Sequence, residues 1–197
     1  MSAIYHRRSI RFPGYDYAQA GYYFITITAH KRLHLFGEIV DGKMITNGAG
    51  RMIERLWHEI ANDFPHVALH ESVIMPNHIH GIIQIQSSVG ADSISALDVM
   101  PTEKSTINQE PMIVTEPKRA EIDSAPTLSN MIQSFKRHTT LRYIKMVKDG
   151  TLSPFDKRIW QCNFYEHIIR NDADHARIAE YIVNNPLTWG EDRFTIP

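Results

Sequence analysis

Two histidines stand two residues apart in the apolar run at 75–83, Met-Pro-Asn-His-Ile-His-Gly-Ile-Ile. The run is typical of a β-strand, whose side chains alternate between two faces, so His78 and His80 point to one side and Ile79 to the other. Neutral imidazole is among the commonest metal ligands in proteins. The spacing therefore predicts half of a metal site.

A second pair of candidate residues lies in a helix predicted at 171–185. Tyr181 and Asn185 are four residues apart, so they share one face of that helix. A phenol and an amide oxygen on one face could approach the same metal as the histidines. Taken alone, the pair is explained as well by a packed aromatic side chain and by a helix stop before Pro186.

The elements that must position these side chains follow from periodicity and capping residues. β-Branched and aromatic residues predict the strands, and Asn47 and Thr127 are suitable helix caps. Pro76-Asn77 predicts a tight antiparallel hairpin. The expected strands are 22–28, 33–40, 67–74, 78–85 and 159–169, and the expected helices are 47–62, 127–148 and 171–185.

This order fits two split βαβ units. We expect an α+β fold, a ferredoxin-like two-layer sandwich with an antiparallel sheet, helices on one side, and an appended C-terminal helix that carries the tyrosine. The strand with the two histidines is expected to be central in the sheet.

Length and composition favour one domain over residues 1–197, of which 43% are hydrophobic. Residues 87–126 lack a sustained period, are rich in Ser, Thr and Pro, and carry seven acidic against three basic side chains. They are expected to form a flexible acidic insertion. No stretch approaches the ~20 apolar residues of a membrane span, and the N-terminus lacks the apolar segment of a signal peptide, so we expect a cytoplasmic protein without a membrane partner.

The single cysteine, Cys162, excludes an internal disulfide and a cysteine-based zinc finger. One thiol could still act as a nucleophile, but we expect it to be buried and inert.

The net charge of −1 hides two basic clusters, because the acidic insertion holds −4 and the remainder +3. Phosphate binding is electrostatic and local, so clusters matter more than the total. Charge alone leaves phosphate contacts and ordinary solvated helix faces as equal alternatives. The clusters are an N-terminal arm with Arg7, Arg8 and Arg11, and a helical segment with Lys136, Arg137 and Arg142.

Three motifs together point to a family. They are the segment 76–80, the pair Trp160-Gln161 followed by 164–170, and the segment 181–186. In this order and spacing they resemble the HUH single-tyrosine transposases, and more specifically the REP-associated tyrosine transposases, a bacterial branch. The resemblance runs from the N-terminal arm to Pro186, apart from residues 87–126.

The resemblance implies an enzyme that cuts and rejoins single-stranded DNA beside a hairpin, through a 5′-phosphotyrosine intermediate. By position, His78 and His80 correspond to the metal-binding pair, Tyr181 to the nucleophile and Asn185 to a third ligand. Insertion-sequence members carry Gln at the last position, and Asn is one methylene shorter, so direct ligation and a water bridge both stay open. With two imidazoles and an amide oxygen, the site suits Mg²⁺ or Mn²⁺.

Several assignments stay open at this level. Tyr165 is an alternative nucleophile, although a stacking aromatic in a strand fits it better. His167 and Arg170 match the branch motif and are candidates for DNA contacts or for a hydrogen-bonded pair at a sheet edge. Monomer and homodimer are both compatible with the sequence. Six further histidines show no pattern: His30, His34, His58, His66, His70 and His175.

Two rival functions remain. A zinc-dependent hydrolase would use His78 and His80 without needing Tyr181. A protein that binds hairpin nucleic acid without catalysis would bind independently of metal.

Overall fold

The computed structural model describes residues 19–87 and 127–191. The predictions for Arg7, Arg8 and Arg11, and for the insertion at 87–126 beyond Ser87, lie outside these residues. The prediction of one domain across the whole chain stays a prediction.

The described elements follow the predicted order. Asn47 caps α1 by accepting hydrogen bonds from the amides of Ala49 and Gly50, and Thr127 caps α2 through the amide of Asn130. The strands are β1 (Gly21–Thr28), β2 (Gly37–Val40), β3 (Lys43–Thr46), β4 (Val67–Ile74), β5 (His78–Ile85) and β6 (Tyr165–Ile169); the helices are α1 (Gly48–Asp63), α2 (Leu128–Lys148) and α3 (Asp172–Asn184), with short 3-10 turns η1 (His30–Arg32) and η2 (Trp189–Glu191).

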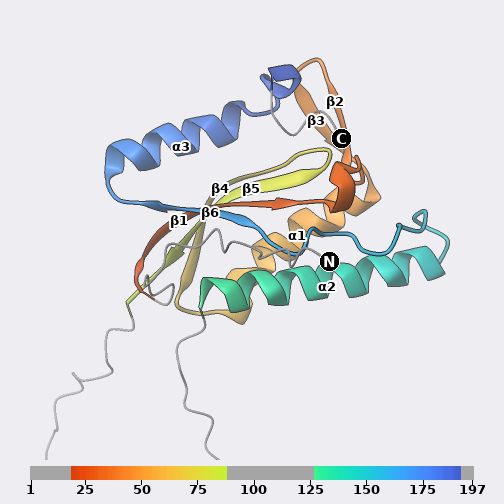
Figure 1. The fold of residues 1–197 in the computed structure, drawn as a ribbon, viewed down its shortest axis with the longest axis horizontal. Helices are drawn as coiled ribbons and strands as arrows, with labels where there is room; N and C mark the ends of the chain where they lie inside the picture. The colour runs from red at the N-terminus through yellow and green to blue at the C-terminus, as the bar shows by residue number, and fades with distance from the viewer. Residues whose placement is uncertain (1–18, 88–126, 192–197) are drawn as a thin grey trace, which may run out of the picture. The chain divides into compact units, whose positions relative to one another are not determined.

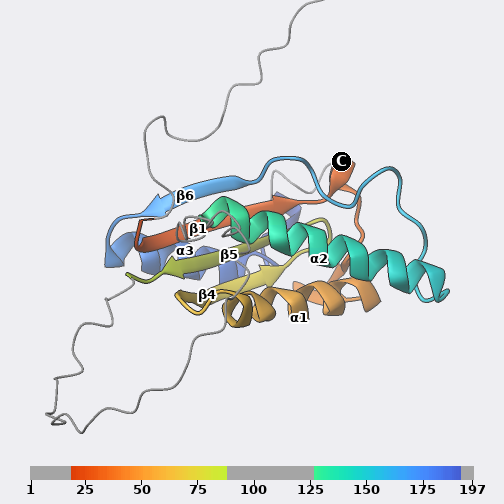
Figure 2. The same ribbon diagram turned by 90° about the horizontal axis from the view of Figure 1, so that it is seen from below.

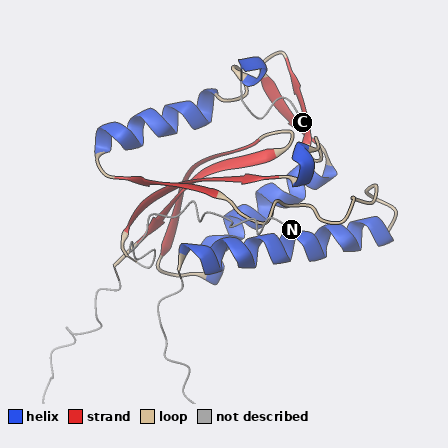
Figure 3. Cartoon of the chain, viewed as in Figure 1, coloured by secondary structure: helices blue, strands red, loops and turns tan. Residues whose placement is uncertain are grey.

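The main sheet has the order β4-β5-β1-β6 with every neighbouring pair antiparallel. The units β1-α1-β4 and β5-α2-β6 each leave a gap that a strand of the other unit fills, as in a ferredoxin-like sandwich (Figures 1 and 3). The predicted fold class is confirmed, and the histidine strand β5 is central.

The two faces of the sheet are covered differently. Helices α1 and α2 lie on one face and α3 lies on the other, as the two views in Figures 1 and 2 show. The side chains of β1 alternate between the two faces. Tyr23, Ile25 and Ile27 belong to the core under α1 and α2, whereas Phe24 belongs to the cluster under α3.

The layer under α3 is small. Ile178 and Ile182, four residues apart on α3, pack against Phe24, Ile82 and Ile169 of the sheet. The layer thus holds the last helix on the sheet and leaves room for polar side chains beside it.

Two strand predictions were too long. The segment predicted as a strand at 33–40 forms only β2, which pairs with a strand that the sequence analysis missed, β3. The segment predicted at 159–169 forms a strand only from Tyr165, although Trp160 makes an isolated bridge to Ala29. The cause is Lys136, whose ammonium group donates to the carbonyls of residues 161, 162 and 163, so these carbonyls turn toward α2 and away from a strand partner.

The prediction that Cys162 is buried is wrong, because its side chain is exposed in this loop and the Arg158 guanidinium donates to its Sγ. Among the helices described, none combines the length and the hydropathy that crossing a bilayer requires.

Candidate active site

Strand register places the two histidines. On β5 the side chains of His78 and His80 face the layer under α3, while Ile79 joins the large core on the other side. His80 lies opposite Thr26 of β1, and His78 lies opposite Thr28. Both imidazoles are fully buried, with exposed fractions of 0% and 1%. Two ionisable rings are thus held in the interior by backbone hydrogen bonds on both sides of their strand.

The imidazoles point at each other. His78 Nε2 lies 2.9 Å from His80 Nε2, and the other ring nitrogens are held at 2.8 Å, Nδ1 of His78 by Asn77 Oδ1 and Nδ1 of His80 by Thr26 Oγ1. Because an amide oxygen only accepts, Asn77 fixes the proton of His78 on Nδ1 and leaves a lone pair on Nε2. The Thr26 hydroxyl can donate or accept, so His80 can carry its proton on either nitrogen.

This arrangement fits a divalent cation. Two nitrogens about 2.1 Å from one ion and at right angles to each other lie about 3 Å apart, which matches the Nε2–Nε2 separation of 2.9 Å. When the Thr26 hydroxyl accepts from His80 Nδ1, both Nε2 lone pairs face the same point. Hydrogen bonds of this kind to the far ring nitrogen orient metal-ligating histidines in general.

Tyr181 reaches the same place from α3. Its hydroxyl lies 3.3 Å from His80 Nε2, and its ring centroid is 5.3 Å from that of His80. The side chain is 42% exposed, so the phenol is accessible from outside while its oxygen lies within hydrogen-bonding distance of His80. The structure thus brings together three of the predicted site residues, His78, His80 and Tyr181.

Asn185 follows Tyr181 by one helical turn and is the C-cap residue of α3. Its side chain is 1% exposed, on the helix that covers the histidine face of the sheet. Beyond it, Trp189 in η2 stacks on His78 with ring centroids 5.9 Å apart and an interplanar angle of 29°. The end of α3 and the following turn therefore close the site from above.

An open pocket of about 280 Å³ leads to Tyr181. His80 and Tyr181 form its inner wall, and His167, Arg177 and Tyr165 stand around it. Asp174 links two of these groups, since it accepts from His167 Nε2 at 3.1 Å and from the Arg177 guanidinium. The hydrogen bond from His167, followed by that from Arg177, lowers the pKa of the Asp174 carboxyl below its usual value. The pocket is therefore lined by polar groups that can donate hydrogen bonds, His167 and Arg177, next to the Asp174 carboxylate.

The predicted basic residues are not gathered at this pocket. Arg137 and Arg142 are exposed on α2, which covers the opposite face of the sheet from Tyr181. Lys136 is committed to three carbonyls, and burial lowers its pKa to about 8. Arg170 lines a separate pocket at the start of α3.

Sequence reasoning missed Thr26, Phe24 and Trp189. Phe24 lies under the site, with its ring 5.3 Å from His80 and 6.2 Å from Tyr181. Alternation along the first strand puts Phe24 and Thr26 on one face, but only the register with β5 shows that this is the histidine face. Sequence reasoning also left His70 and His175 without a pattern, and the structure brings them together, 105 positions apart, with Glu71.

Comparisons with known proteins give one clear relative. No protein-family model matches the chain. An uncharacterized protein of Haemophilus influenzae (strain ATCC 51907 / DSM 11121 / KW20 / Rd) is 35% identical over 195 residues, which cover 99% of this chain and 96% of that protein.

Among solved structures, a REP-associated tyrosine transposase bound to a REP hairpin is similar, with a TM-score of 0.54, 18% identity, and coverage of 95% of this chain and 76% of that chain. At this identity the similarity shows a shared fold. A candidate transposase of Deinococcus radiodurans R1 overlaps more loosely, with a TM-score of 0.44, 11% identity, and coverage of 88% of this chain and 95% of that chain.

Proposed function

The chain belongs to the same family as the uncharacterized Haemophilus influenzae protein and has a transposase-like fold, and from this premise we propose that it cleaves and rejoins single-stranded DNA next to a hairpin. Tyr181 is the proposed nucleophile, and His78 and His80 are the proposed ligands of Mg²⁺ or Mn²⁺. One observation carries the proposal: the Tyr181 hydroxyl lies 3.3 Å from the nitrogen that His80 turns toward His78.

The proposed reaction is a phosphoryl transfer to tyrosine. The Tyr181 oxygen loses its proton and attacks phosphorus, the P–O bond to the 3′ oxygen breaks, and that oxygen leaves as a 3′ hydroxyl once protonated. A 5′-phosphotyrosine results, and attack by a 3′ hydroxyl reverses the step and joins the ends. A bound divalent cation would polarise a nonbridging phosphate oxygen.

The chain's own residues supply orientation. Asn77 and Thr26 hold the far nitrogens of the two histidines, and the stacked Trp189 limits how far the His78 ring can turn. Asn185 is a proposed third ligand, directly or through water, because it is buried one turn after Tyr181 on the covering helix. Arg177 and His167 are proposed to contact phosphate oxygens in the open pocket.

The partner is proposed to be single-stranded DNA with a hairpin, because the solved transposase of the same fold is bound to a REP hairpin. Arg7, Arg8, Arg11, Lys136, Arg137, Arg142 and Arg170 stay proposed nucleic-acid contacts. Those on α2 are separated from Tyr181 by the sheet, so a stem that reaches them has to pass around an edge of the sheet. A cytoplasmic location and a homodimer stay predictions of the sequence.

The decisive experiment is incubation of the protein with a labelled library of single-stranded hairpins in Mg²⁺ or Mn²⁺, followed by a denaturing gel and mass spectrometry of the adduct. We expect a DNA adduct on Tyr181 that disappears in Tyr181→Phe and in His78→Ala. Tyr165→Phe is the matched control, because Tyr165 lines the same pocket and its loss should leave the adduct in place.

Other outcomes would point elsewhere. Cleavage that persists in Tyr181→Phe and needs zinc would indicate a metal-dependent hydrolase. Tight hairpin binding without an adduct, and without dependence on metal, would indicate a binding protein.

A further inference from the structure

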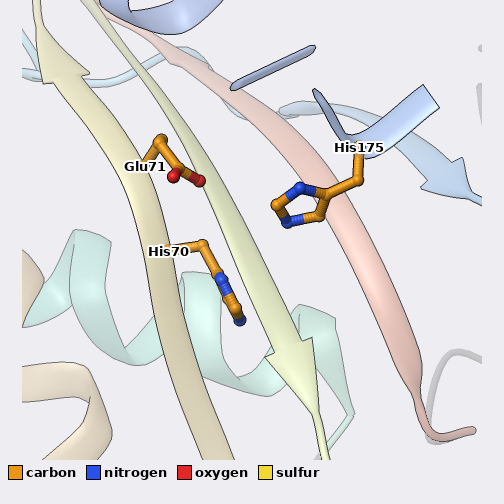
Figure 4. A group of neighbouring side chains, drawn as sticks. All are labelled: His70, Glu71 and His175. Carbon is orange, nitrogen blue, oxygen red and sulfur yellow. The ribbon is translucent and has the colours of Figure 1, made fainter. Parts of the chain in front are cut away.

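His70, Glu71 and His175 form a second cluster of metal-binding side chains, outside the candidate active site. One ligand atom from each lies within 4.8 Å of the other two. Figure 4 shows His70 and Glu71 on β4 and His175 on the facing segment of α3. We propose that these three residues bind a transition-metal ion of the zinc type and thereby fasten the tyrosine-bearing helix to the edge of the sheet.

A β-bulge brings two neighbouring residues of β4 into one cluster. The register with β5 shifts by one position between Leu69 and Ser72, so His70 and Glu71 together stand opposite Ile82. In a regular strand two consecutive side chains would point to opposite faces, whereas a bulge re-aims one of them. The irregularity therefore has a local result: two donors from consecutive positions gather beside His175.

The chemistry of the donors selects the metal. Two imidazoles and one carboxylate suit zinc and its neighbours, whereas Mg²⁺ and Ca²⁺ prefer sites built from oxygen ligands. Donors around a tetrahedral zinc ion lie about 3.4 Å apart, so side-chain rotation has to close the 4.8 Å set by only about 1.4 Å.

The hydrogen bonds leave donor atoms available. His70 Nε2 lies 3.1 Å from Gln84 Oε1, so it can donate its proton there and keep the Nδ1 lone pair for a metal. Glu71 Oε2 and His175 Nε2 are buried and have no hydrogen-bond partner within the described part of the chain. Buried polar atoms are normally paired, and a metal ion would satisfy both.

The surroundings fit an ion. The Tyr22 ring packs edge-on against both imidazoles, with centroids 5.2 Å from His70 and 5.1 Å from His175, and so limits their movement. A pocket of about 360 Å³ beside the two histidines leaves space for a water ligand. Arg170 and Asp172 also line it, and their opposite charges offset each other, so Glu71 remains the anionic partner of the cation.

The position of the cluster gives the ion a role. His175, Ile178 and Ile182 share one face of α3, and the two isoleucines belong to the small apolar cluster that holds this helix. A metal cross-link at His175 would add an anchor about two turns before Tyr181. It would thus fix the helix that presents the tyrosine, without touching the tyrosine itself.

Zinc binding can be tested in protein stripped of metal with a chelator. The candidate active site is silenced by His78→Ala with His80→Ala, and zinc binding is followed by native mass spectrometry and calorimetry. We expect one zinc equivalent to remain in this background. Its affinity should fall on His175→Asn or Glu71→Gln by more than the about 10–100-fold that losing a group that only orients a ligand costs, because one of three protein ligands is lost. Absence of the remaining equivalent, or an unchanged affinity in both ligand variants, would overturn the proposal.

A matched control comes from α1, which carries the adjacent pair His58-Glu59. The changes His58→Asn and Glu59→Gln remove the same two residue types at consecutive positions outside the cluster, and they should leave zinc affinity unchanged. A loss equal to that of the cluster variants would contradict the assignment.

A measurement on the unmutated protein avoids any folding defect of the variants. Zinc should shift the imidazole NMR signals of His70 and His175 together. It should also slow amide hydrogen exchange in α3 more than in α1. Unshifted signals of these two histidines at saturating zinc would sink the proposal even if zinc binds elsewhere.

Discussion

The two faces of the main sheet differ in what they bury. Within the described residues, the face under α1 and α2 carries a cluster of 22 buried hydrophobic residues, and the face under α3 carries five. The second face instead buries polar groups, among them Thr26, His78 and His80. Burying imidazoles is costly unless they are hydrogen-bonded or bind a metal. The large core can supply the stability that lets the opposite face hold a reactive site.

The sharpest comparison between the faces uses one residue type on one strand. Ile79 packs in the large core and Ile82 under α3, and both are fully buried. We expect Ile79→Ala to lower the free energy of unfolding by about 3–5 kcal/mol, and Ile82→Ala by about 2–3 kcal/mol. The loss at Ile82 is smaller because α3, which is held by a small apolar cluster, can move to close part of the cavity. Urea denaturation measures both losses. Equal or reversed losses would contradict the claim that the face under α1 and α2 contributes more to stability than the face under α3.

Gly81 tests how closely α1 approaches the back of the site. A Cβ at this position would collide with the Trp57 ring, on the face opposite His80. We expect Gly81→Ala to destabilise the fold by about 1–3 kcal/mol, because a packed ring has to move. In the Trp57→Leu background the same change should cost at least about 1 kcal/mol less. Additive losses in this double-mutant cycle, measured by denaturation, would show that the ring is not the obstacle.

Thr26→Val tests the support of the histidine pair. Valine keeps the shape of the side chain but removes the oxygen that lies 2.8 Å from His80 Nδ1. We expect Mn²⁺ affinity to fall about 10–100-fold, the usual cost of losing a group that orients a metal ligand. Calorimetric titration measures the change, with Thr28→Val on the same strand face as control. A similar loss in both variants would assign the effect to general packing.

The smallest expected effect concerns pH. The hydrogen bond from His167, and then that from Arg177, lowers the pKa of Asp174 from its usual 3.8. The stabilisation is therefore present above the ordinary pKa of the carboxyl and is lost as the pH falls through its lowered folded value. We expect Asp174→Asn to flatten the acid limb of a plot of unfolding midpoint against pH. Asp149→Asn, at the residue that follows α2, is the control, and superimposable curves for Asp174→Asn and the unmutated protein would refute the expectation.

Much of the fold could be predicted because local signals agree with it. The strands β4 and β5 and the caps Asn47 and Thr127 lie where periodicity and capping chemistry place them. The strand predicted at 159–169 was too long because the competing partner, Lys136, is distant in sequence. Propensity reports what a segment can do alone, and the half-buried ammonium group of Lys136, 25 positions before Gln161, changes the outcome.

Some residues of the candidate site could be predicted from local sequence patterns, and others could not because their positions depend on strand pairing. The histidine pair follows from the two-residue period of a strand, and the pair Tyr181 and Asn185 follows from the helical period. Thr26 could not be found, because its role depends on the pairing of β1 with β5. His70 and His175 could not be found either, because their approach depends on a bulge that shifts the strand register by one residue.

The pairing of β1 with β5 also protects the site from assembly errors. A slip of one residue along β5 would turn the two histidines into the large core under α1 and α2, and would turn Ile79 to the face under α3. Such a chain would lose most of its stability together with its active site, so a folded molecule with a misaligned site is strongly disfavoured. The stability of the fold and the geometry of the site thus depend on the same strand register. A chain that folds stably therefore also places His78 and His80 correctly.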